Sequence, residues 1–264
     1  MSEYNQIKLR ISGNRATISL DRPGKHNALN PEMIRELHEA VTRLEQRDDL
    51  QFVVLSGEGP SFCAGADLEW FAGSVRQDQE QIRQEYELLA DLLEKLVYLP
   101  QITIAVAHQN VLGGGNGLLA ACDFAVAEEM TSFAFSEVRL GIIPAIIMPV
   151  VFKRVASRNL RKLMFSGERF GAAEAHLIGL IDFIAGPGES MKMANKLMDE
   201  LGSVSPGALK ACKQLILKVD SGEVGLQNGA YTASVLAGLI HTEEAREGLQ
   251  AFFEKRSPVW IHQK

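Results

Sequence analysis

The sequence has few cysteines, and their spacing matches neither a disulfide framework nor a zinc site. The 264 residues include Cys63, Cys122 and Cys212, and no CxxC motif occurs. An odd number of widely separated cysteines argues against a disulfide-stabilised secreted fold and fits a reducing compartment. The six histidines form no HxxxH pair. We therefore predict that the protein holds no metal.

Long apolar runs and an excess of positive charge are also missing. No stretch contains the roughly 18 consecutive apolar residues that suggest a membrane-spanning helix, and the opening "MSEYNQIKLR" lacks the apolar centre of a signal peptide. The formal net charge is −6, which argues against a broad nucleic-acid-binding surface. These features predict a cytoplasmic protein with neither membrane nor nucleic-acid partners.

Strand-like and helix-like segments alternate through the first half of the chain. Apolar residues after Pro31 recur at helical spacing, and Asn30 precedes them as a candidate helix cap. A helix is also predicted for "GLLAACD". Strands are predicted for five stretches: "IKLRI", "RATISL", "FVVLSG", "ITIAVAHQNVL" and "FAVA". This alternation indicates an α/β fold with parallel strands and βα crossovers.

The last part of the chain is predicted to be mostly helical. One strand is predicted there, at "LIDFIAG", and helix follows helix from "GALKACKQLILKV" onward. We therefore predict two regions, a sheet-containing core at residues 1–200 and a helical region at residues 201–264.

The stretch "VLGGGNGLLAACD", residues 111–123, places three consecutive glycines between a predicted strand and a predicted helix. Backbone N–H groups are free at a helix N-terminus and favour negative charge. The dinucleotide pattern GxGxxG fails at Leu118, and the Gly-Lys-Ser/Thr ending of a phosphate-binding loop is absent. An oxyanion hole and close packing of helix on strand both remain open.

A second glycine-containing stretch, "SFCAGADL" at residues 61–68, makes the pattern more specific. "FCAGADL" followed by "VLGGGNGLLAACD" resembles the crotonase superfamily, also called the enoyl-CoA hydratase/isomerase family. Further stretches match the same family in the same order: "LDRPGKHNALNPEM", "FSEVRLGIIP", "FSGERFGAAEAHLIGLID" and "EGLQAFFEKRSP". The resemblance covers almost the whole chain.

This resemblance implies a fold, a ligand and an assembly. The implied fold is a crotonase-like ββα spiral core with a helical C-terminal trimerisation region, in a homotrimer or a hexamer made of two trimers. The implied ligand is an acyl-CoA thioester, and CoA arrives as part of the substrate, so no separate cofactor is expected. By the same resemblance, the CoA thioester is bound near Lys25, Ala64, Asp67 and Leu68. Lys25 could instead be a solvated loop cation, and Asp67 a helix cap.

The resemblance also assigns the chemistry. The backbone amides of Ala66 and Gly114 match the oxyanion hole, and Glu137 matches an acid/base glutamate. An ion pair between Glu137 and Arg139 is the alternative. The family's better-known hydratases carry another glutamate where this chain has Gly117. We expect Gly117 to open space in the substrate-binding site.

Three functions follow from this pattern. The first is an enoyl-CoA hydratase that adds water across the 2,3 double bond, with Glu137 as acid/base. The second is a Δ3-Δ2-enoyl-CoA isomerase with Glu137 as its single proton shuttle, and the third is a catalytically weak acyl-CoA-binding protein. The stretch "IIPAIIMPVV" is similar to hydratases of branched glutaconyl-CoA substrates, such as 3-methylglutaconyl-CoA and its isohexenyl homologue. A branched acyl group could then use the space at Gly117.

Overall fold

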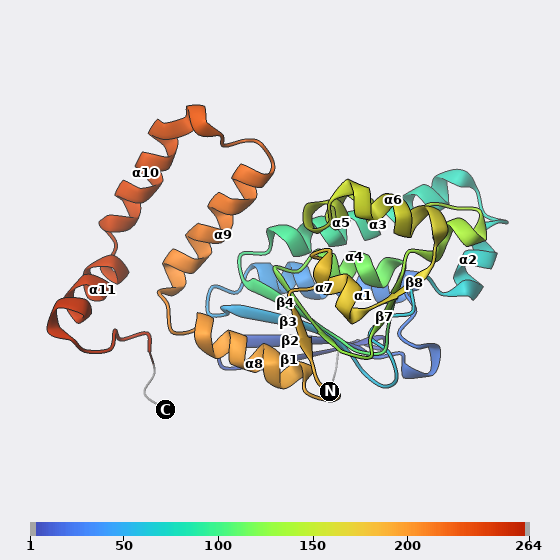
Figure 1. Cartoon of the computed structure of the whole chain (residues 1–264), viewed down its shortest axis with the longest axis horizontal. Helices are drawn as coiled ribbons and strands as arrows, with labels where there is room; N and C mark the ends of the chain where they lie inside the picture. The colour runs from blue at the N-terminus through green and yellow to red at the C-terminus, as the bar shows by residue number, and fades with distance from the viewer. Residues whose placement is uncertain (1–3, 262–264) are drawn as a thin grey trace. The chain divides into compact units, whose positions relative to one another are not determined.

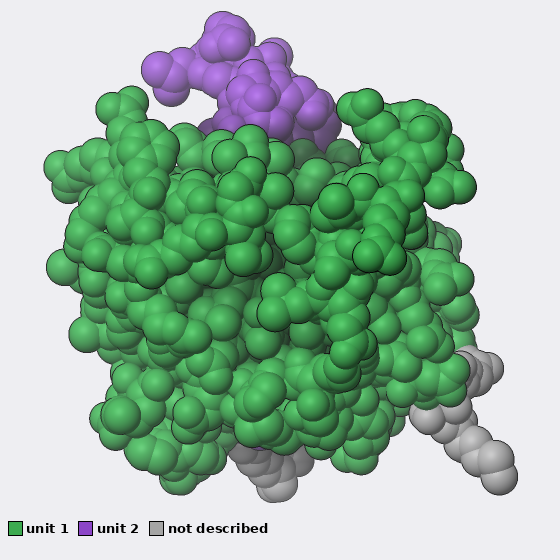
Figure 2. Space-filling view, turned by 90° about the vertical axis from the view of Figure 1, so that its right-hand side faces the viewer, with its two compact units in different colours: residues 1–194 green, residues 195–264 purple. Residues whose placement is uncertain are grey.

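The computed structural model of the chain describes residues 4–261. The chain divides into two compact units, residues 1–194 and 195–264 (Figure 2). The division lies within helix α8 (Ser190–Leu201), whereas the sequence predicts a boundary at 200/201.

The first unit is built on a six-stranded sheet. Its order is β1-β2-β3-β4-β6-β9. In this order each strand from β2 onward is parallel to the next, whereas β1 and β2 form an antiparallel hairpin. Apolar residues dominate β3 and β4, and all six residues of β4 are buried, as expected for parallel strands covered on both faces. The strands span Ile7–Ser12, Arg15–Leu20, Phe52–Gly57, Ile102–Ala107, Phe124–Glu128 and Phe183–Ala185.

A second, three-stranded sheet has the order β5-β7-β8, over Asn110–Leu112, Ser132–Ala134 and Arg169–Gly171. It corrects the prediction of one strand over "ITIAVAHQNVL". That stretch forms β4 in the first sheet and β5 in the second. Gln109 lies between them with φ +54°, a left-handed conformation that ends the extended run. The chain thus leaves one sheet and enters the other just before the glycines.

Helices pack over the strands of the first unit (Figure 1). Helix α1 packs on β1 and β2 and on α3, and α4 packs on β4, β5 and α5. Asn30 caps α1 as predicted, because its side chain accepts a hydrogen bond from the Met33 amide at 2.8 Å. The helices of this unit, beside α8, are α1 (Pro31–Glu45), α2 (Leu68–Ser74), α3 (Gln79–Tyr98), α4 (Gly114–Ala120), α5 (Met148–Arg154), α6 (Ser157–Ser166) and α7 (Ala172–Leu177). Two 3₁₀ helices are η1 (Pro23–Lys25) and η2 (Ser136–Leu140).

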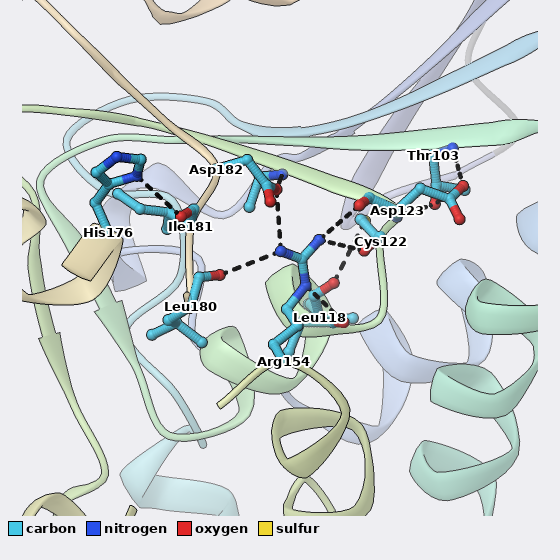
Figure 3. A network of polar contacts seen from close by, with 11 residues as sticks. Thr103, Leu118, Cys122, Asp123, Arg154, His176, Leu180, Ile181 and Asp182 are labelled. Carbon is cyan, nitrogen blue, oxygen red and sulfur yellow. Dashed lines mark hydrogen bonds and ion pairs between the residues drawn. The ribbon is translucent and has the colours of Figure 1, made fainter. Parts of the chain in front are cut away.

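Arg154, at the end of α5, contacts both the segment that follows α4 and the segment that precedes β9 (Figure 3). Its guanidinium donates to the carbonyl oxygens of Ala120, Cys122 and Asp123 at 3.2, 2.7 and 2.9 Å. It also donates to the Leu180 carbonyl oxygen at 3.5 Å and forms an ion pair with Asp182 at 3.0 Å. These contacts fix the C-terminal end of α4, the helix whose other end begins at the glycines.

The second unit consists of helices, as predicted from residue 201 onward. They are α9 (Pro206–Asp220), η3 (Leu226–Asn228), α10 (Gly229–Ile240) and α11 (Glu243–Glu254). Within residues 4–261, no helix combines the length and the apolar character that crossing a bilayer requires.

Candidate active site

A cavity of about 730 Å³ lies within the first unit. It is bounded by the 64–68 segment, helices α2 and α3, the start of α4, and the segment from η2 to the start of α5. Most of its lining is apolar. The lining residues are Leu29, Ala64, Gly65, Ala66, Leu68, Trp70, Phe71, Ser74, Val75, Ile82, Tyr86, Leu89, Gly113, Gly114, Ser136, Glu137 and Leu140 to Ile147.

The 61–68 segment presents the amide of Ala66 to this cavity. Leu29 pairs with the segment on one side, since its amide donates to Gly65 O at 2.7 Å and its carbonyl accepts from the Asp67 amide at 2.8 Å. Ala66 lies between these two bonded groups, so its own N–H points away from Leu29. No hydrogen bond among the described residues uses the Ala66 amide. Gly65, at φ +90°, gives the turn that only glycine adopts without strain.

The first turn of α4 presents a second amide. Gly113, at φ +46°, donates to Ala134 O at 3.0 Å, and α4 begins at the next residue, Gly114. An N–H at the first helical position has no partner within its helix, and none is found for Gly114 among residues 4–261. Gly65 and Gly113 lie against each other, because a Cβ on Gly113 would be 3.7 Å from Gly65 Cα. Two unpaired amides therefore line one cavity.

Glu137 brings a carboxyl group to the same cavity. It lies in η2, and its Oε2 is buried without a hydrogen-bond partner. Burial raises the pKa of Glu137 above its ordinary value, because the charged form loses solvation. Arg139 donates instead to Ser166 O at 3.1 Å. The alternative of a Glu137–Arg139 ion pair is therefore absent from this structure.

Gly113 explains how the carboxyl group fits so close to α4. A Cβ on Gly113 would stand 3.1 Å from Glu137 Oε1, which is tighter than ordinary van der Waals contact. The glycine therefore serves two purposes, a left-handed turn before the Gly114 amide and room for the Glu137 side chain. Both alternatives considered for the glycines, exposed amides and close packing, occur in this one segment.

Lys25 and Asp67 do not line the cavity. Lys25 is exposed and forms an ion pair with Glu69 at 2.8 Å. Asp67 caps α2 by accepting from the Glu69 amide and pairs with Arg22 at 2.9 Å. Burial opposes ionisation of Asp67, but its hydrogen bonds to Arg22 and to the Glu69 amide outweigh that effect and lower its pKa. The helix-cap alternative for Asp67 is thus present in the structure.

The expectation of open space at Gly117 is wrong. A Cβ at this position would lie 2.9 Å from Ile147 Cβ and 3.4 Å from Leu93 Cδ1. Gly117 is buried and does not line the cavity, whereas Ile147 does. The side chain of Ile147 takes the space that the sequence suggested would be free.

The sequence did not indicate the roles of two further residues near this site. Ile147 belongs to an apolar run whose burial the sequence cannot assign. Asn116 reads as a polar neighbour of the glycines, yet it is fully buried and donates through Nδ2 to Ala134 O at 2.8 Å. That bond holds the first turn of α4 to the end of β7, three residues before Glu137. An asparagine inside a run of small and apolar residues was the available signal.

The wall formed by α2 and α3 is also unmarked in the sequence. Trp70 Nε1 donates to Glu85 at 2.6 Å, and the rings of Trp70 and Tyr86 lie 5.4 Å apart. Both aromatic residues line the cavity. Their spacing along amphipathic helices looks like ordinary core packing, so nothing singles them out before the fold is known.

The chain is similar to known proteins over nearly its whole length. The family model described as enoyl-CoA hydratase/isomerase matches residues 10–263. An enoyl-CoA hydratase from Shewanella pealeana is 34% identical, with a TM-score of 0.92 over 98% of this chain and 97% of that one. An enoyl-CoA isomerase/hydratase of Mycosarcoma maydis is 30% identical, covering 91% of this chain and 90% of that protein. A short-chain-enoyl-CoA hydratase of Clostridium acetobutylicum is 28% identical, over 96% and 97%.

The structural similarity confirms the predicted fold class over nearly the full length of the chain. The matched segment includes every residue that lines the cavity. The relatives are enzymes named for hydration or isomerisation of enoyl-CoA thioesters. On the family match and the shared fold together, this chain belongs to the enoyl-CoA hydratase/isomerase family.

Proposed function

We propose that this protein is an enoyl-CoA hydratase in which Glu137 transfers the proton and the amides of Ala66 and Gly114 bind the thioester oxygen. One observation carries the proposal: a buried carboxyl group with an unpaired oxygen shares a cavity with two unpaired amides. The combination suits a reaction that moves a proton while negative charge develops on a carbonyl oxygen.

The steps follow from these groups. Glu137, as a carboxylate, takes a proton from water while the water oxygen bonds to C3 of the enoyl group. The electrons of the 2,3 double bond move toward the thioester, and the oxygen becomes negatively charged. The Ala66 and Gly114 amides stabilise that charge without reorganising, a contribution of roughly 3 kcal/mol for each donor. Glu137 then returns its proton to C2, which restores the thioester and the carboxylate.

The chemistry asks for no group beyond the substrate itself. Proton transfer is carried by Glu137, and charge stabilisation is carried by two backbone amides. CoA is part of the thioester, so we propose that no separate cofactor takes part.

Isomerisation is the second candidate, and a specific observation favours it. Among the described residues that line the cavity, Glu137 is the single carboxyl group. A single base suffices to take a proton from C2 of a 3-enoyl thioester and return it to C4. The relative from Mycosarcoma maydis carries both activities in its name.

The narrower assignment to hydratases of branched glutaconyl-CoA substrates rests on the "IIPAIIMPVV" stretch. The space expected at Gly117 no longer supports it. The described lining also contains no lysine, arginine or histidine, so a second carboxylate on the acyl group would have no cationic partner there. We therefore expect crotonyl-CoA to be a better substrate than 3-methylglutaconyl-CoA, and the comparison of their kcat/KM values decides the narrower assignment.

The deciding experiment incubates the protein separately with crotonyl-CoA, 3-methylglutaconyl-CoA and a 3-enoyl-CoA in deuterated water. Mass spectrometry and NMR identify the products, and Glu137→Gln is the control. Addition of water that falls by 10²- to 10⁴-fold in the variant supports the hydratase. A shifted double bond without added water selects the isomerase, and no turnover of any substrate leaves an acyl-CoA-binding protein.

A further inference from the structure

Helix α4 directs two glycines along one face, and only one of them reaches the cavity. Gly114 and Gly117 are three residues apart, so their side-chain positions lie on the same side of the helix. Gly114 lines the cavity, whereas Gly117 is covered by Ile147. Ile147 lies just before α5 and lines the cavity itself. Whatever α4 could offer at position 117 is therefore replaced by the hydrocarbon side chain of Ile147.

Leu93 also lies against position 117. Its Cδ1 is 3.4 Å from a Cβ built on Gly117, and its side chain is buried. Ile147 and Leu93 thus leave too little room at position 117 even for a methyl group, because a Cβ there would lie 2.9 Å from Ile147 Cβ. Neither can bind water, because a hydrocarbon surface offers no hydrogen bond.

We propose that Ile147 is a reaction-specificity residue, a plug that keeps position 117 closed, so that α4 cannot place a second carboxyl group beside Glu137. The proposal rests on the proposed function, since it concerns which groups handle the proton. It goes further in assigning the single-carboxyl chemistry to a steric cause. Removal of the plug would make room for a second carboxyl group on α4.

The steric part is tested by thermal unfolding without substrate, and so does not depend on activity. Gly117→Glu introduces an overpacked, buried carboxyl group and should lower Tm by roughly 5–15 °C. Combining it with Ile147→Gly should recover at least half of that loss. The matched control pairs Gly117→Glu with Ile146→Gly, because Ile146 lines the same cavity but is not among the atoms nearest Gly117. This control should recover none of it.

The chemical part is tested by turnover of crotonyl-CoA and of a 3-enoyl-CoA. We expect Gly117→Glu with Ile147→Gly to hydrate crotonyl-CoA at least tenfold faster than Gly117→Glu alone. Its ratio of hydration to isomerisation should also exceed that of Ile147→Gly alone, because two carboxyl groups can hold the water between them.

The outcomes separate the two proposals. If wild-type protein turns over no enoyl-CoA, the proposed function fails, while the unfolding data still decide whether Ile147 is a plug. The plug is overturned if Gly117→Glu melts at the wild-type temperature. It is equally overturned if Ile146→Gly rescues the variant as well as Ile147→Gly does.

Discussion

Glu137 is placed where its charge is poorly solvated, and this has a consequence for the pH dependence of the rate. Burial raises its pKa, and the proposed reaction begins with the carboxylate. We therefore expect kcat/KM for crotonyl-CoA to rise with pH through a pKa above the ordinary glutamate value of about 4.3. A pH–rate profile measures this. An inflection at or below the ordinary value, or one that persists in the residual activity of Glu137→Gln, would contradict the assignment.

The same burial predicts a stability effect with a definite sign. A raised folded-state pKa contributes stability that is present below the unfolded pKa and lost as pH rises through the folded pKa. Glu137→Gln should therefore be more stable than wild type at pH 7–8, by roughly 0.5–2 kcal/mol. The advantage should shrink as pH falls toward about 4.3. Urea unfolding across this pH range measures the difference.

The Gly114 amide can be removed without breaking α4. Proline lacks an N–H but is well tolerated at the first helical position, where Gly114 lies. A Cβ there would meet Leu29 Cδ1 at 2.8 Å, so Leu29→Ala should accompany Gly114→Pro. We expect kcat to fall 10²- to 10³-fold relative to Leu29→Ala alone. A rate within threefold of that control, with helical circular dichroism unchanged, would rule out a role for this amide.

At the residue scale, motifs in the sequence predicted three candidate groups that lie together in the structure. Glu137, Ala66 and Gly114 stand in stretches quoted from the sequence, and the structure brings all three to one cavity. Ile147 and Asn116 could not be found in the same way. Their roles depend on which distant backbone they contact, the helix face at Gly117 and the carbonyl of Ala134, and neither contact leaves a local pattern.

At the element scale, periodicity predicted the strands and helices but not where one sheet ends and the next begins. The sequence predicts one strand over "ITIAVAHQNVL", whereas β4 is buried throughout and β5 buries only Val111. The break depends on a single left-handed residue, Gln109, and glutamine is not a residue that signals such a turn. This break is what places the glycine segment beside the 61–68 loop, through the pairing of Cys63 with Val111.

The end of α4 depends on Arg154, and a substitution there should be costly. Its guanidinium donates to four carbonyl oxygens and pairs with Asp182 at once, an arrangement that lysine cannot reproduce. We expect Arg154→Met to destabilise the protein by about 3–5 kcal/mol, because Asp182 and the carbonyl groups lose their partner. Urea unfolding measures this. Arg158→Met, at an exposed position of α6, should change stability by less than about 0.5 kcal/mol.

At the scale of the whole molecule, the two units differ in how much core they possess. The first unit buries most of its apolar side chains, whereas among residues 195–261 the buried apolar residues are Met198, Val224 and Ala251. Helix α10 buries none of its residues and contains no charged side chain. An isolated helix of about 12 residues is marginal in water. The helical structure of this region could be predicted from the sequence, but its lack of a core of its own could not.

We propose that α10 packs against other copies of this chain, in the trimer or hexamer that the family resemblance implies. Leu236 and Ile240 are 60% and 53% exposed, and contact between such faces would remove apolar surface from water. Leu236→Glu should dissociate the assembly, because it places a charge in that contact. Sedimentation velocity measures the change, and Met130→Glu, at an exposed apolar position of the first unit, serves as the control. A monomeric wild-type protein would refute this arrangement, because the exposed face of α10 would then have no partner to cover it. A Leu236→Glu variant that sediments like wild type would refute it as well, because the charge would then lie outside the contact.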